Sequence, residues 1–265
     1  MRIHNLRAAN KAAVKPFAVQ AAAEETTVWL YDFIGFDPWT QTGVGAEQFA
    51  KEIAAIKTPV IRLRINSPGG SVFDGRAMAA ALKAHKSKVV ASIEGVAASA
   101  ATFVAVAADE VQMAKGSMFM IHNAWTIAMG NANDLMETAA LLEKLDGTLV
   151  DDYTEKTGKS AQQVKDWMAA ETWFTADEAV AAGFADAVVD GDQVDAAYDL
   201  SAYGERAPKM SAHLEVTATV DVPVADVQQA SKEIAEEVAA QIEEDMTSAW
   251  EASNRNQLLI DKTSA

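Results

Sequence analysis

The chain contains four histidines, and histidine is the side chain that most often serves as a general base at neutral pH. His4 lies near the N-terminus, His85 stands among lysines near the end of a predicted helix, and His213 lies in a polar region. Only His122 ends an apolar run, residues 117–121, where a strand would hold the imidazole rigidly. A histidine with a purely structural role is the alternative interpretation of His122.

Ser99 could serve as a nucleophile because it follows a predicted strand, residues 88–93, and lies at the first turn of a predicted helix, residues 98–108. Backbone N–H groups at a helix N-terminus and the positive end of the helix dipole stabilise a developing alkoxide. Gly95 and the alanines around Ser99 would let a substrate backbone approach closely. An ordinary N-cap serine is the alternative, and the local sequence favours neither.

The third feature is the turn Ser-Pro-Gly-Gly-Ser at residues 67–71, which again lies between a predicted strand and a predicted helix. Consecutive glycines permit positive φ values and the close approach of another backbone. Their N–H groups could therefore face a bound carbonyl oxygen, and an oxyanion hole needs two such donors. A plain β-turn is the alternative for this motif.

An alternating pattern of strands and helices surrounds these residues. Hydrophobic periodicity and turn signals predict strands at 27–35, 59–65, 88–93, 110–113, 118–121 and 184–189, and helices at 46–56, 74–85, 98–108 and 133–156, with two shorter helices starting near Ser160 and Thr175. The alternation predicts an α/β fold with parallel strands and right-handed crossovers. Chemistry in such folds belongs at the strand-to-helix turns.

Composition and charge exclude several classes of protein. The formal net charge is -16 and the sequence pI is about 4.6, which disfavours binding to nucleic acid or to anionic membrane surfaces. Cysteine is absent, so disulfides, thiolate catalysis and cysteine-based metal sites are excluded, and a cytoplasmic location is expected. The longest apolar stretch, residues 89–108, is interrupted by Glu94 and Ser99 and is too polar to predict a membrane span.

Three regions are predicted along the chain. Residues 1–25 carry basic side chains but lack the apolar core of a signal peptide, which favours a flexible or processed arm. Residues 26–194 contain the strand and helix pattern and form the predicted folded domain. Residues 195–265 are predicted to form a polar linker and an acidic helical tail, with the helix at 224–246.

The motifs together resemble the Clp protease proteolytic subunit over roughly residues 27–190. They are Ile-Asn-Ser-Pro-Gly-Gly at 65–70, Gly-Val-Ala-Ala-Ser at 95–99, Met-Ile-His at 120–122 and the Thr-Ala-x-Glu-Ala motif that begins at 175. The resemblance implies a Clp peptidase/crotonase-like fold of repeated ββα units. It also implies a protruding handle helix at 133–156, although the apolar stripe of that helix could equally be core packing.

The same resemblance implies roles for individual residues of a serine endopeptidase. Ser99 falls on the nucleophile and His122 on the general base, and the backbone N–H groups of Gly70 and Ala100 fall on the oxyanion hole. Glu171 occupies the position of the family's aspartate, which is a departure, although a glutamate can orient an imidazole. The fallback acids are Asp177 and Asp186.

The resemblance further implies a polypeptide substrate, no cofactor or metal, and a homo-oligomeric ring, with seven or fourteen subunits as the family's form. The Ala-rich helix, the Trp173-Phe174 pair and the acidic tail look more like the phage and prophage branch, which is thought to process capsid or scaffold proteins. The sequence lacks a phosphate-binding loop of the G-x-x-x-x-G-K-[S/T] type, so any dependence on ATP would come from a separate unfoldase.

Three other hypotheses remain open at this point. A crotonase-like enzyme acting on acyl-CoA would share the fold and the paired backbone amides. A peptidase with a Ser-Lys dyad would use Lys115, the nearest lysine candidate in the sequence. A catalytically inactive scaffold or assembly protein would use the acidic tail to dock other chains.

Overall fold

The computed structural model describes residues 17–36, 42–190, 200, 203 and 207. Contacts divide the chain into two units, residues 1–212 and residues 213–265, and every described residue belongs to the first unit. The predicted acidic helix at 224–246 lies outside the described residues. All strands and helices among the described residues therefore lie in the first unit.

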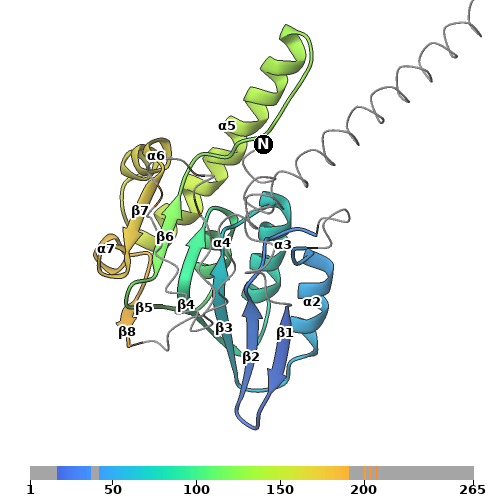
Figure 1. The fold of residues 1–265 in the computed structure, drawn as a ribbon, viewed down its shortest axis with the longest axis vertical. Helices are drawn as coiled ribbons and strands as arrows, with labels where there is room; N and C mark the ends of the chain where they lie inside the picture. The colour runs from blue at the N-terminus through green and yellow to red at the C-terminus, as the bar shows by residue number, and fades with distance from the viewer. Residues whose placement is uncertain (1–16, 37–41, 191–199, 201–202, 204–206, 208–265) are drawn as a thin grey trace, which may run out of the picture. The chain divides into compact units, whose positions relative to one another are not determined.

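The first unit is built on a mixed sheet of eight strands (Figure 1). Its main path runs in the order β1-β2-β3-β4-β5-β8, and β6 joins β4 to β7. All pairings are parallel except β1 with β2 and β6 with β7. The strands are β1 (Ala18–Ala21), β2 (Glu25–Leu30), β3 (Val60–Ser67), β4 (Lys88–Ala98), β5 (Glu110–Ala114), β6 (Met118–Ile121), β7 (Thr172–Thr175) and β8 (Ala187–Val189).

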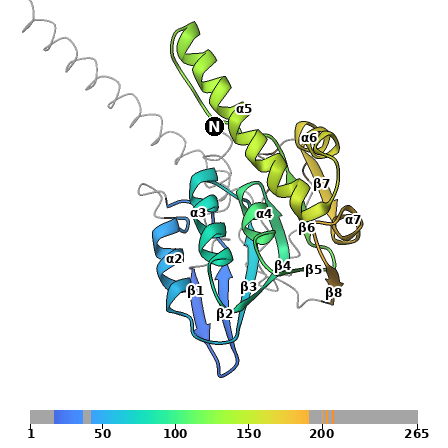
Figure 2. The same ribbon diagram turned by 180° about the vertical axis from the view of Figure 1, so that it is seen from behind.

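Helices cover the sheet and extend beyond it. Figure 2 shows α2, α3 and α4 together on one face of the sheet, and α5 projecting away from the strands. The helices are α2 (Ala46–Ala55), α3 (Val72–Lys83), α4 (Ala100–Ala105), α5 (Ala132–Thr157), α6 (Ala161–Ala170) and α7 (Ala176–Ala182). The predicted α/β class with parallel strands is confirmed, and each predicted helix inside the described range is present.

The main core lies between the sheet and the helices on its covered face. Strand β2 buries Val28 and Leu30 on the same side, as the two-residue period of a strand requires. Helix α2 buries Phe49 and Ile53, which are four residues apart and therefore share one face. Burial of a side chain of this size contributes about 1.5–3 kcal/mol. The apolar residues whose spacing predicted these elements are thus the residues that pack the elements into the core.

Helix α5 packs along only part of its length. Leu149, Val150 and Tyr153 in its C-terminal half are buried, whereas Leu135 and Met136 in its N-terminal half are exposed. The apolar stripe predicted along this helix is therefore not simple core packing. A capping box of Asn131 and Asp134 fixes the N-terminus of the exposed half.

Two observations bear on the predicted segment boundaries. Residues 18–21 form β1, which pairs antiparallel with β2 and thus belongs to the sheet rather than to a flexible arm. Leu200 and Tyr203 are buried against residues of the sheet, and Ala207 packs against them. We therefore propose that the folded domain extends past the boundary predicted at residue 194.

Two properties of the described residues bear on other classes of function. None of the described helices combines the length and the apolar character that crossing a membrane requires. Among the described side chains, histidines, aspartates and glutamates form no group of three or more that could hold a metal ion.

Candidate active site

Ser99 lies on a sharp turn between β4 and α4. Its backbone has φ 53° and ψ -123°, a region that non-glycine residues rarely adopt and that costs about 1–3 kcal/mol. The Ser99 N–H donates to the carbonyl oxygen of Met120 at 2.9 Å, which holds this strained residue against β6. The Ser99 side chain makes no capping hydrogen bond to α4. Ser99 is therefore not an ordinary N-cap serine, and its hydroxyl is directed elsewhere.

His122 meets Ser99 because of the register between β4 and β6. The parallel pairing aligns Ala98 with Met120, so the residues that follow these two strands emerge at the same edge of the sheet. The result is a distance of 2.7 Å between Nε2 of His122 and Oγ of Ser99. With the ring proton on Nδ1, Nε2 can accept the hydroxyl proton of Ser99, as a general base must.

Glu171 is brought to His122 by the next pairing in the sheet. Strand β7 runs antiparallel to β6 and aligns Thr172 with Ile121, so that the preceding Glu171 falls beside His122. Glu171 is the C-cap of α6 and has the left-handed values φ 51° and ψ 75°. Its Oε2 lies 3.9 Å from Nδ1 of His122, and both side chains are buried. This separation permits charge attraction and is longer than a hydrogen bond.

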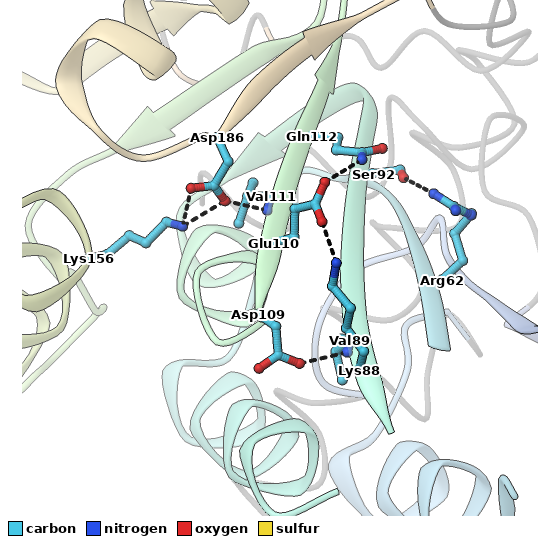
Figure 3. Close-up of polar contacts among 10 residues, drawn as sticks. All are labelled: Arg62, Lys88, Val89, Ser92, Asp109, Glu110, Val111, Gln112, Lys156 and Asp186. Carbon is cyan, nitrogen blue, oxygen red and sulfur yellow. Dashed lines mark hydrogen bonds and ion pairs between the residues drawn. The ribbon is translucent and has the colours of Figure 1, made fainter. Parts of the chain in front are cut away.

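The two fallback acids lie elsewhere. Asp186 forms an ion pair with Lys156 at 3.0 Å and accepts a hydrogen bond from the Val111 N–H at 2.7 Å (Figure 3). Asp177 is exposed in the first turn of α7. Of the three acids suggested by the sequence, the structure places only Glu171 beside His122.

Lys115, the candidate for a Ser-Lys dyad, lies in the turn between β5 and β6, at the opposite end of β6 from His122. Its Nζ forms an ion pair with Asp190 at 2.6 Å, and its side chain is 74% exposed. The hydrogen bond to Asp190, together with the charge of that carboxylate, raises the pKa of Lys115 above its usual range, which is the wrong direction for a general base. The structure therefore favours His122 over Lys115 as the base.

The glycine turn packs directly against the backbone around Ser99. A Cβ atom on Gly69 would lie 2.4 Å from the Ala98 carbonyl oxygen and 2.8 Å from Ser99 Cβ, so only glycine fits there. Gly69 and Gly70 both have positive φ values, 88° and 152°. The two turns that were considered separately in the sequence are thus in van der Waals contact.

A short bridge to Ile34 sets the direction of the amides in this turn. The Ile34 N–H donates to the Gly69 carbonyl and the Ser71 N–H donates to the Ile34 carbonyl, both at 2.9 Å. Neither bond uses the Gly70 N–H. Because the N–H and C=O groups of a trans peptide point in opposite directions, the Gly70 N–H points away from Ile34. Ala100, the first residue of α4, supplies a second N–H beside Ser99.

A chain of two hydrogen bonds links the carbonyl group of Ser99 to helix α5. The Thr102 hydroxyl donates to the Ser99 carbonyl oxygen at 2.5 Å and lies 2.5 Å from the Tyr153 hydroxyl. Since Thr102 has one hydroxyl proton, Tyr153 is the donor in the second bond. Burial raises the pKa of Tyr153, which keeps this donor protonated. Helix α5 is thereby connected to the backbone of the nucleophile.

Sequence reasoning missed three residues of this region. Thr102 and Tyr153 were assigned to helices but not to the site. They are 51 positions apart in the sequence, so their hydrogen bond could not be foreseen. Tyr203 fell in the region predicted to be a polar linker. Its three-residue spacing from Leu200, which places the two side chains near each other in a helical turn, is a signal that could have marked it.

Comparisons with known proteins show which family the chain resembles. A family model described as Clp protease matches residues 46–192. The ATP-dependent Clp protease proteolytic subunit of Streptococcus sanguinis is 32% identical over 146 residues, which cover 52% of this chain and 72% of that protein. The ATP-dependent Clp protease proteolytic subunit 1 of Chlamydia abortus is 34% identical over 129 residues, covering 47% of this chain and 67% of that protein.

A solved structure of a Clp peptidase has a similar fold. A ClpP1 mutant from Listeria monocytogenes matches with a TM-score of 0.53 and 23% sequence identity. The match covers 62% of this chain and 91% of that chain. At this identity the likeness concerns the fold, and the fold is that of the Clp peptidases.

Proposed function

Because the chain belongs to the Clp protease family, we propose that it is a serine endopeptidase that cleaves peptide bonds through an acyl-enzyme on Ser99. The family consists of peptidases, generally of the serine type. The observation that carries the proposal is the distance of 2.7 Å between Ser99 Oγ and His122 Nε2 at a strained strand-to-helix turn. A serine held in this way has no role in capping the helix that follows it.

The proposed reaction is acyl transfer in two stages. His122 removes the hydroxyl proton of Ser99 as Oγ attacks the peptide carbonyl carbon, and the N–H groups of Gly70 and Ala100 stabilise the resulting oxyanion. His122 then gives the proton to the leaving amine as the C–N bond breaks. A water molecule, activated by the same imidazole, attacks the ester and releases the new carboxyl group and the serine. Every proton that leaves Ser99 or water thus passes through His122.

Glu171 is the proposed orienting acid. Its carboxylate faces the Nδ1 side of His122, so it favours the tautomer with the proton on Nδ1 and stabilises the imidazolium that forms during the reaction. The distance of 3.9 Å means that this stabilisation is mainly electrostatic in the free enzyme. Catalytic groups that lie too far apart for a good hydrogen bond in a free enzyme often move closer when substrate binds.

The active form is proposed to be a homo-oligomeric ring of seven or fourteen subunits. Support comes from the outer part of α5 and the segment before it, where large apolar side chains are exposed, including Met129 at 94% and Met136 at 61%. Apolar side chains gathered on one projecting element are typical of a contact surface. Stacking of such rings through α5 would cover them.

Polypeptide is the proposed substrate class, and the specific targets are phage capsid or scaffold proteins. The support is the likeness of the Ala-rich segment, the Trp173-Phe174 pair and the acidic tail to the phage and prophage branch of the family. The cytoplasm is the proposed compartment because the chain lacks cysteine. No cofactor is needed for acyl transfer through Ser99 and His122.

An acyl-enzyme measurement separates this proposal from its rivals. The protein is mixed with a peptidyl p-nitrophenyl ester and its intact mass is recorded within the first turnover, followed by peptide mapping. The peptidase gains the mass of the acyl group on Ser99, and Ser99→Ala does not. A crotonase-like enzyme would consume acyl-CoA without this adduct, and an inactive scaffold would show neither reaction.

A further inference from the structure

Tyr203 lies at the candidate site although it comes from outside the family match, which ends at residue 192. Its ring is buried and packs edge-on against His122, with 5.9 Å between ring centroids and an interplanar angle of 71°. The ring also meets Trp173 of β7 at 5.6 Å and 80°. Tyr203 therefore fills the space beside the candidate base.

The hydroxyl of Tyr203 reaches the glycine turn. It donates a hydrogen bond of 2.6 Å to the carbonyl oxygen of Pro68, and the bond is buried. The same peptide group is held at its other end, because the Gly69 N–H donates to Ser67 Oγ at 3.2 Å. Both polar atoms of the Pro68-Gly69 peptide are thus fixed by side chains.

Fixing this peptide has a consequence for the next one. The Gly69-Gly70 peptide carries the N–H proposed to bind the oxyanion, and its carbonyl accepts from the Ile34 N–H. Glycines resist rotation of a peptide plane less than other residues, so two consecutive glycines need external restraint to hold one amide direction. Tyr203 and Ile34 supply that restraint on successive peptides.

We propose that Tyr203 is a positioning residue of the active site, which holds the oxyanion turn through Pro68 and braces the His122 ring through its edge-on contact. The proposal rests on the proposed peptidase function. It gives one side chain contacts to two separate parts of the proposed machinery, the glycine turn and the His122 ring.

The test uses the affinity of a peptide boronate in the full-length protein. A boronate forms a tetrahedral adduct with the catalytic serine and places an oxygen in the oxyanion hole, so its inhibition constant reports on that hole and does not depend on the folded fraction. Tyr203→Phe keeps the ring and removes the bond to Pro68, and we expect the constant to rise about tenfold, because small displacements at a reacting centre can cost up to about a hundredfold. Tyr203→Leu also removes the brace on His122, and we expect a larger rise.

Two controls separate positioning from stability. Ser87→Ala removes a hydroxyl that donates to the Thr58 carbonyl far from the site, and it should leave the boronate constant unchanged. The inhibition constant of the matching peptide amide, which cannot form the adduct, should be the same in wild type and Tyr203→Phe.

Each outcome has a separate meaning. If the boronate does not bind wild-type protein covalently at Ser99, the proposed function fails. If it binds wild type and Tyr203→Phe equally well, or if Ser87→Ala weakens it as much as Tyr203→Phe does, the inference about Tyr203 is overturned and the peptidase proposal stands.

Discussion

The side chain of Ser99 lies 2.7 Å from Nε2 of His122, and one strand pairing brings together these two residues, which are 23 positions apart in the chain. Strand β4 ends at Ala98 and β6 ends at Ile121, and their parallel register delivers both residues to the same edge of the sheet. The chemistry proposed for this protein depends on that register. A shift by one residue would turn the side chains to the opposite face.

Glu171→Gln should lower the rate of peptide hydrolysis by about a hundredfold or more, because the amide cannot stabilise the imidazolium of His122. The rate is measured with a fluorogenic peptide at saturating concentration. The control is Asp177→Asn, which neutralises an exposed acid in α7 and should keep the wild-type rate. A large loss in Asp177→Asn with little change in Glu171→Gln would show that Glu171 is not the orienting acid.

Gly70→Ala should abolish hydrolysis, because the new Cβ would lie 2.0 Å from the Ile34 carbonyl oxygen and would push the turn away from Ser99. Gly116→Ala is the matched control, since Gly116 also has a positive φ, 83°, but a Cβ added there would meet no atom within 4 Å. The control should lose only about 1–2 kcal/mol of stability from backbone strain. Thermal unfolding and peptide hydrolysis are measured for both. Equal activity in the two variants would contradict the role assigned to the Gly70 turn.

Thr102→Val should slow acylation of Ser99, because the Ser99 carbonyl and the Tyr153 hydroxyl would each lose a buried partner. The expected loss of stability is about 1–3 kcal/mol. Thr157→Val is the control: it removes a similar bond from a threonine hydroxyl to the Tyr153 carbonyl, within α5 and not to Ser99. Pre-steady-state acylation at a temperature where both variants are folded separates the effects. If both variants acylate at the same rate, the chain from α5 to Ser99 does not affect catalysis.

Met136→Glu should reduce the mass of the assembly seen by sedimentation, because it places a charge in the exposed apolar part of α5. The monomer fold should not change, since Met136 is exposed and makes no part of the core. Glu143→Gln, on the same helix, serves as the control and should leave the mass unchanged. An unaltered assembly in Met136→Glu would remove α5 from the proposed ring contacts.

The order of strands and helices was predictable because local patterns and burial agree over most of the chain. Strand β6 has the predicted bounds, and α7 begins with the predicted capping box of Thr175 and Glu178. One difference lies at the end of β4, where a strand was predicted to end at residue 93 and a helix to begin at residue 98. There β4 continues to Ala98, because Ala97 pairs with β3 and residues 96–98 pair with β6.

The candidate site was only partly predictable, for reasons that lie in tertiary structure. The residue types and their positions after strands marked Ser99, His122 and the glycine turn. Strand β7 was missed because it has four residues between two helices, yet its pairing with β6 is what brings Glu171 to His122. The contacts of Tyr203 could not be predicted, because its partners His122 and Pro68 are distant in sequence.

The central claim is tested most directly by labelling with a fluorophosphonate, followed by peptide mapping, in wild type, Ser99→Ala, His122→Ala and Lys115→Ala. We predict that wild type and Lys115→Ala are labelled at Ser99, that Ser99→Ala is not labelled, and that labelling of His122→Ala is much slower. Folded wild-type protein that remains unlabelled, or labelling that survives His122→Ala and is lost in Lys115→Ala, would contradict the account.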